Sequence, residues 1–196
     1  PAEGPFSRLP DAVRSDESSQ RPLWEALAGR YMGTNRRRGY TYTWLTGHLA
    51  DAHGRIAPRS LLLALRKAAE ITAEKYPDYE TALHYEAIKR GVAEASDTRV
   101  HELSREDYPW VEPLLKELRN CAVPIEIEEL RQKWTSAVLD KVLLVSGKKL
   151  PPRGFALASP AQRDVELLVD DLEELGVLYR TEDKRINIPD IFRVGF

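Results

Sequence analysis

Two arginine-rich segments carry residue types that can bind an anion. The first is the run Arg36-Arg37-Arg38, which lies between Gly33 and Gly39. Guanidinium groups bind phosphates and carboxylates through paired N–H donors, and aromatic rings can stack on arginines or on bases. The run is flanked by a fourth arginine and several aromatic residues: Arg30, Tyr31, Tyr40, Tyr42 and Trp44. The alternative interpretation is a solvated basic turn beside a small aromatic cluster.

The second segment runs from Gly54 to Ser60, where Pro58 begins a predicted helix and Arg59 falls in its first turn. Free backbone N–H groups at a helix start favour an anion. A cation there opposes the helix dipole, at a small cost. This cost favours a bound anion or an acidic partner at Arg59.

A third basic group lies in a proline-rich loop before the last long helix. Lys148, Lys149 and Arg153 are candidate phosphate contacts in this loop. The alternative is a charged loop that only meets solvent.

No pattern in the chain predicts catalysis, and we expect no catalytic residue. His48 and His53 lack the i, i+4 spacing that zinc sites use on a helix, so no metal site is expected. The segment from Ser146 to Lys149 lacks the Gly-x-x-x-x-Gly-Lys-Ser/Thr spacing of a phosphate-binding loop. Cys121 is predicted to be a small buried hydrophobic residue.

The composition predicts a compact protein of one or two modules. The 196 residues are 42% hydrophobic and carry a net charge of −2, which argues against bulk nucleic-acid binding but leaves room for a local patch. One cysteine suits a reducing compartment, and no signal peptide or membrane span is visible. Because the sequence begins at Pro1 without a methionine, we expect a piece of a larger cytoplasmic protein.

Residue patterns predict a mainly α fold with two modules that follow a flexible arm. Residues 1–21 are rich in proline and polar residues and are predicted to be this arm. Residues 22–109 are predicted to form a helical bundle that begins at Pro22. Residues 110–196 are predicted to form a winged-helix domain that ends in a small β-hairpin.

Local signals place the elements within these modules. Helices are expected from Pro58 to Tyr76, over 79–95 and from Ser159-Pro160 to a C-terminal glycine at Gly176. Ser104 resembles the first residue of a helix-capping box. The segment from Tyr40 to Trp44 fits a strand or a helix start equally well.

The charge of the last long helix argues against DNA recognition by it. Residues 161–175 contain one base and six acids, a net charge of −5. DNA phosphates repel such a helix, although a winged helix commonly places its last helix in the major groove. A winged helix that docks on protein is therefore favoured.

The segment from Gly54 to Leu62 resembles the Gly…Pro-Arg helix that follows the nucleotide-binding core in AAA+ and STAND-like P-loop ATPases. The stretch from Tyr31 to Trp44 also resembles one in uncharacterised bacterial P-loop ATPases. The resemblance implies a helical lid followed by a winged helix, with Arg59 sensing nucleotide beside an ATPase core that binds ATP and magnesium. The phosphate loop and the acidic magnesium-binding strand are missing, so the chain by itself is not expected to be an enzyme or to bind a cofactor.

The resulting hypothesis is a regulatory, C-terminal part of a bacterial P-loop ATPase. Its expected partners are the ATPase core of the same protein and a further protein or oligomer. Some ATPases of this kind serve in phage defence or DNA transactions. The alternative hypothesis is a nucleic-acid-binding winged-helix module that uses the basic residues of the first and third groups.

Overall fold

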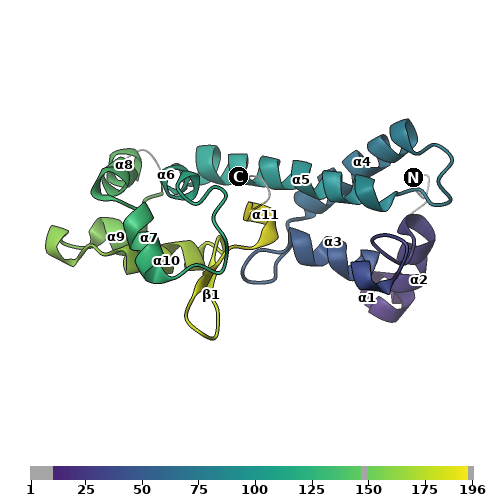
Figure 1. Ribbon diagram of the computed structural model, residues 1–196, viewed down its shortest axis with the longest axis horizontal. Coiled ribbons are helices and arrows are strands. Elements are labelled where there is room, and N and C mark those ends of the chain that lie inside the picture. The colour runs from purple at the N-terminus through teal and green to yellow at the C-terminus, as the bar shows by residue number, and fades with distance from the viewer. Residues whose placement is uncertain (1–10, 147–149, 194–196) are drawn as a thin grey trace. The chain divides into compact units, whose positions relative to one another are not determined.

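The computed structural model describes residues 11–146 and 150–193 (Figure 1). These residues are mainly helical with one small two-stranded antiparallel sheet, which confirms the predicted mainly α class with a β-hairpin. The chain folds into two compact units. Unit 1 comprises Pro1–Gly47 and Ala64–Gly91, and unit 2 comprises His48–Leu63 and Val92–Phe196. The predicted domains, 22–109 and 110–196, divide the chain differently and stay a prediction.

Unit 1 is built from helices near the N-terminus and from parts of two long helices. Its buried apolar side chains include Met32, Leu45, Ala68 and Ile88. Trp24 donates its indole N–H to the Thr41 hydroxyl at 3.0 Å, which ties the second helix to the third. The helices that lie wholly or partly in this unit are α1 (Asp11–Ser15), α2 (Glu17–Ala28), the 3₁₀ turn η2 (Arg36–Arg38), α3 (Thr41–Leu49), α4 (Pro58–Lys75) and α5 (Tyr85–His101).

Unit 2 buries an apolar core between short helices. Leu114, Leu130, Leu168 and Leu172 are fully buried. The helix α10 (Val165–Glu174) packs against α7 (Ile127–Lys133) and α9 (Arg153–Leu157). Trp134 donates its indole N–H to the Leu114 carbonyl oxygen at 3.0 Å, which joins α6 to the end of α7. Its further elements are the π-helix η3 (Glu102–Asp107), α6 (Val111–Lys116), α7 (Ile127–Lys133), α8 (Ser136–Ser146), α9 (Arg153–Leu157), η4 (Pro160–Gln162), α10 (Val165–Glu174), β1 (Tyr179–Arg180), β2 (Ile186–Asn187) and α11 (Asp190–Arg193).

The predicted hairpin is present and gains a third extended segment. β1 pairs antiparallel with β2, and Gly176 at φ +74 ends α10 as predicted. Ile125, just before α7, forms an isolated antiparallel bridge with Ile186 of β2. Each of these two residues donates its N–H to the carbonyl oxygen of the other at 2.8 Å. The extended segments therefore lie in the order Ile125, β2, β1.

Several predicted helix starts are wrong because a competing cap lies nearby. α2 begins at Glu17 rather than at Pro22, since the Asp16 carboxylate accepts the Ser19 N–H and caps the helix earlier. Residues 11–21, expected in the arm, thus fall in α1 and the first part of α2, apart from Asp16, which caps α2. α10 begins at Val165 rather than at Pro160, since Asp164 caps it.

Two further local predictions are corrected in the middle of the chain. The helix expected over 79–95 is α5, which begins only at Tyr85, after a loop that follows Pro77. Ser104 does not start a helix, because it lies inside η3 and its hydroxyl donates to the Val100 carbonyl oxygen at 2.7 Å. The open choice at Tyr40 to Trp44 resolves to a helix, α3, from Thr41.

Candidate functional site

The exposed face of α10 is acidic, and its buried face is apolar. Val165, Leu168 and Leu172 are buried, whereas Glu166 and Asp170 project their carboxylates with side chains 57% and 61% exposed. This pattern follows from the amphipathic sequence, since the acids alternate with the apolar residues at helical spacing. The helix therefore presents negative charge on the side away from the core.

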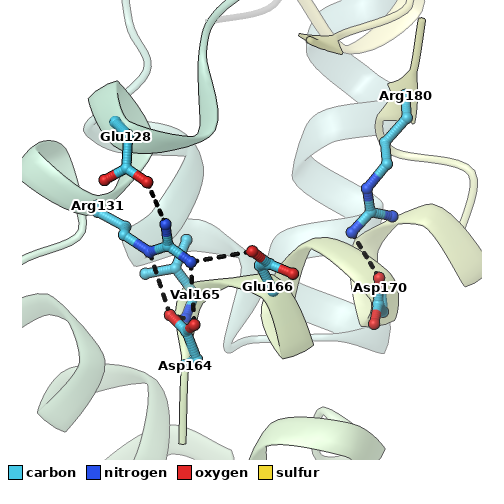
Figure 2. Close-up of polar contacts among 7 residues, drawn as sticks. All are labelled: Glu128, Arg131, Asp164, Val165, Glu166, Asp170 and Arg180. Carbon is cyan, nitrogen blue, oxygen red and sulfur yellow. Dashed lines mark hydrogen bonds and ion pairs between the residues drawn. The ribbon is translucent and has the colours of Figure 1, made fainter. Parts of the chain in front are cut away.

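Arg131 of α7 is held by carboxylates from two elements (Figure 2). Its Nη2 lies 3.0 Å from Asp164 Oδ2 and 3.0 Å from Glu166 Oε1, and its Nε donates to Asp164 Oδ1 at 3.3 Å. Its Nη1 donates to Glu128 within α7. The guanidinium is thus bound to three carboxylates, two at the start of α10 and one within α7.

Arg180 of β1 is paired in the same way with the other half of α10 (Figure 2). Its Nη2 donates to Asp170 Oδ1 at 2.6 Å, and its Nη1 donates to Glu173. The Arg180 backbone N–H also donates to Glu173 Oε1 at 2.7 Å. The two arginines that lie against the acidic face therefore neutralise carboxylates of this protein.

These contacts shift the acid–base properties of the groups involved. Hydrogen bonds from Arg131 lower the pKa of Asp164 below its ordinary value. The same hydrogen bonds, chiefly to Asp164, raise the pKa of Arg131. In the hairpin, Arg185 and then Thr181 bind the Asp183 carboxylate and lower its pKa to about 2. The charged forms of these groups are therefore the stable ones at neutral pH.

One acid of α10 has a structural role that the sequence did not reveal. Asp171 is buried and accepts the backbone N–H groups of Gly154 at 2.8 Å and Phe155 at 3.0 Å. It therefore binds the first turn of α9 from a neighbouring element. Of the other acids of α10, Glu166 pairs with Arg131, and Asp170 and Glu173 pair with Arg180.

The predicted basic loop before α9 is described only at Arg153. Lys148 and Lys149 lie outside the described residues. Arg153 is exposed at the start of α9 and lines a cavity of about 190 Å³ with Tyr108, Trp110 and other residues. The structure therefore does not bring a described basic cluster to this place.

Arg59 lies in the first turn of α4, as predicted, and its side chain is 78% exposed. Its Nη1 lies 2.6 Å from Glu102 Oε1, although the two atoms are not in hydrogen-bonding geometry. Glu102 also approaches Arg99, at 4.0 Å between Nη1 and Oε2. Sequence reasoning missed Glu102, since no local signal connects residues 43 positions apart.

A cavity of about 310 Å³ lies beside the start of α4 in unit 2. Its polar lining includes Arg55, Ser60 and Arg99, and Asp51 pairs with Arg55 at 3.1 Å. Arginines, a hydroxyl and a helix start suit an anion, and a bound anion at this segment stays a prediction. The carboxylates of Asp51 and Glu102 balance part of that positive charge.

The three arginines from Arg36 to Arg38 form η2, and all three are exposed. They lie in unit 1, in a loop whose ends meet at a β-bridge between Tyr31 and Tyr40. Arg30 lies over the rings of both tyrosines, 5.5 and 5.8 Å from the ring centres. Of the four predicted arginines, Arg30 therefore contacts aromatic rings, and an anion site at the run Arg36 to Arg38 stays a prediction.

The remaining predictions of chemistry concern metals, the cysteine and the membrane. Within 11–146 and 150–193, no group of three or more His, Cys, Asp or Glu side chains is placed to hold a metal ion. Cys121 is partly exposed rather than buried, because its segment lies on the surface between α6 and α7. None of the helices described is both long and apolar enough to cross a membrane.

Comparisons of the chain with models of protein families, with curated proteins and with solved structures found no match.

Proposed function

We propose that this chain is a regulatory and interaction part of a bacterial P-loop ATPase, and that its C-terminal region is a winged-helix module. The order of elements supports the winged helix: α6, the bridge residue Ile125, α7, α8, α10 and then the hairpin. In a winged helix, a short extended segment after the first helix pairs with the hairpin strands. The Ile125–Ile186 bridge fits that pairing.

The winged helix acts by docking on protein rather than by reading DNA. The observation that carries this proposal is the pairing of Arg131 and Arg180 with the carboxylates of α10 (Figure 2). Bases that bind DNA phosphates must be available to them, whereas these two are already bound to acids. The exposed face of α10 carries acids already paired with bases, which suits a protein surface of mixed charge rather than phosphates.

Arg59 is the proposed contact to nucleotide, in concert with an ATPase core that binds ATP and magnesium. Its exposed guanidinium at the start of an 18-residue helix supports this role. Glu102 would hold Arg59 in place until a phosphate competes for it. The chain contains no phosphate-binding loop, so this part alone does not hydrolyse ATP.

The test compares ATP hydrolysis by the full-length protein with Arg59→Gln and Arg66→Gln. Arg66 is a matched control, because it lies in the same helix, is 71% exposed and also pairs with a glutamate. We expect Arg59→Gln to lower kcat by about tenfold or more, as loss of an arginine near a transferring phosphate does. Arg66→Gln is expected to leave kcat unchanged.

Two results would overturn the proposal. One is equal turnover by both variants and the unmodified protein. The other is ATP hydrolysis by the purified 196-residue chain that Arg59→Ala abolishes, because the chain would then be an ATPase by itself.

A further inference from the structure

The loop from Tyr31 to Tyr40 is closed at its base by backbone hydrogen bonds. The Met32 N–H donates to the Gly39 carbonyl oxygen at 2.9 Å, and the Thr41 N–H donates to that of Arg30 at 3.1 Å. Tyr31 and Tyr40 pair as a bridge, and their ring centres lie 5.3 Å apart. The loop is therefore a fixed projection rather than a free chain segment.

The tip of this loop is also ordered by its own residues. Asn35 caps η2, since its Oδ1 accepts the Arg37 N–H at 3.0 Å. The Gly39 N–H closes the turn on the Arg36 carbonyl oxygen at 3.1 Å. A Cβ at Gly33 would lie 3.1 Å from Cγ of Arg38, so the Arg38 stem packs over that glycine. The backbone that carries the three arginines is thus set before any ligand arrives.

The charge of the three arginines is not balanced within the part of the chain that the structure describes. No described carboxylate forms an ion pair with Arg36, Arg37 or Arg38, unlike Arg59, Arg131 and Arg180. The sequence agrees, since residues 26–50 contain no acid although the chain has 31. This loop is therefore a local positive patch on a chain whose net charge is negative.

The direction of the side chains distinguishes between polyanions. A 3₁₀ turn has three residues per turn, so three consecutive side chains leave it about 120° apart. A flat anionic surface would contact only some of three side chains that point in such different directions. A nucleic-acid groove has phosphates on both of its sides, and a narrow projection entering it can reach both rows with different arginines.

We propose that the Tyr31–Tyr40 loop enters a groove of double-stranded nucleic acid and that Arg36, Arg37 and Arg38 bind phosphates on its two strands. The contacts are to the backbone, so the site reads the duplex form rather than its sequence. This site lies in unit 1 and does not depend on the proposed function of the winged helix. The duplex would be DNA or RNA, which carry the same phosphate chemistry.

The experiment measures binding of the full chain to fluorescent 20-base-pair duplexes of DNA and of RNA, by anisotropy, over a series of salt concentrations. The variant replaces Arg36, Arg37 and Arg38 with Gln. Each lost phosphate contact lowers the slope of log K against log salt by about 0.9, so we expect a slope about 2.7 smaller. A triple Arg→Lys variant keeps the charges and is expected to keep the slope.

The matched control replaces Arg66, Lys75 and Arg90 with Gln, which removes the same charge from exposed positions of the same unit. This control is expected to bind within twofold of the unmodified chain. Tighter binding to either duplex than to the matching single strand supports the proposal and identifies the nucleic acid. Three results would overturn it. One is an equal loss of duplex affinity in the Arg36/Arg37/Arg38→Gln variant and in the Arg66/Lys75/Arg90→Gln control, and another is equal affinity for duplexes and single strands. The third is binding to vesicles of anionic lipid but to neither duplex.

Discussion

Gly91 of α5 lies so close to the Ala64 carbonyl oxygen of α4 that a Cβ at Gly91 would be 2.2 Å from that oxygen. The contact is with backbone, which cannot rotate away as a side chain does. Only a glycine therefore permits the two helices to approach to this distance. The absence of a side chain at Gly91 therefore sets how closely α4 and α5 approach.

Gly91→Ala is expected to lower the free energy of unfolding by about 1–3 kcal/mol, because the two helices must separate to admit the methyl group. Gly47→Ala is the control, since a Cβ at Gly47 of α3 meets nothing within 4 Å. That change is expected to raise the free energy of unfolding by about 0.5–1 kcal/mol, as alanine favours the helix. Urea unfolding followed by circular dichroism measures both, and opposite signs are required.

His84 is expected to make unit 1 sensitive to mild acid. It is buried, stacks on Tyr76 with ring centres 3.7 Å apart, and its Nδ1 accepts the Glu86 N–H at the start of α5. Burial lowers the pKa of His84 below its ordinary 6.5. The unfolded chain thus binds a proton at His84 more readily than the folded chain does. The contribution of neutral His84 to the free energy of unfolding is therefore fully present above pH 6.5. It is lost as the pH falls through the lower folded pKa.

His84→Asn tests this dependence, because asparagine keeps an acceptor for the helix start but does not titrate. We expect the fall in unfolding free energy between pH 7.5 and pH 5 to be smaller in this variant than in the unmodified chain. His101→Asn changes an exposed histidine and is expected to leave that fall unchanged. An identical fall in all three proteins contradicts the prediction.

Asp183 is expected to stay charged far into acid. Hydrogen bonds from Arg185 and Thr181 lower its pKa from 3.8 to about 2. Its contribution to stability is therefore present above about pH 3.8 and disappears as the pH falls towards 2. A carbon NMR titration of the carboxyl group should give a midpoint near 2, and Arg185→Gln should move that midpoint towards 3.8. Arg153→Gln, at an exposed arginine of α9, should not move it.

Asp171→Ala is expected to destabilise unit 2 by about 1–3 kcal/mol, because the Gly154 and Phe155 N–H groups lose their acceptor. Asp171→Asn retains one oxygen and should cost less. Asp140→Ala removes an exposed acid of α8 and should change the unfolding free energy by less than about 0.5 kcal/mol. Urea unfolding of the three variants provides the comparison, and equal effects of Asp171→Ala and Asp140→Ala would refute the capping role.

Sequence patterns predicted the elements with strong local signals. The helix from Pro58, the glycine end of α10 and the hairpin follow from proline geometry, positive φ and β-forming residues. Helix starts were wrong where two caps competed, as at Asp16 and Asp164, since each offers a carboxylate close to a proline that also fits a first turn. Local sequence rules do not decide which of two such nearby residues begins the helix.

The candidate site divides in the same way. The acidic α10 and the run from Arg36 to Arg38 are visible in the sequence, because like charges lie next to one another or at helical spacing. The pairing of Arg131 with Asp164 is not, since it joins residues 33 positions apart through the packing of α7 on α10. The buried position of Asp171 is hidden for the same reason.

The bridge between Ile125 and Ile186 also bears on the rate of folding. It joins two residues 61 positions apart, and loop-closure entropy must be overcome before its two hydrogen bonds form. Local helices such as α8 and α10 can form in microseconds or less. A pairing between residues so far apart in the sequence raises the contact order, and formation of this bridge is therefore expected to be slower. We therefore expect β2 to pair with Ile125 late in folding, after the helices between the two isoleucines have packed together.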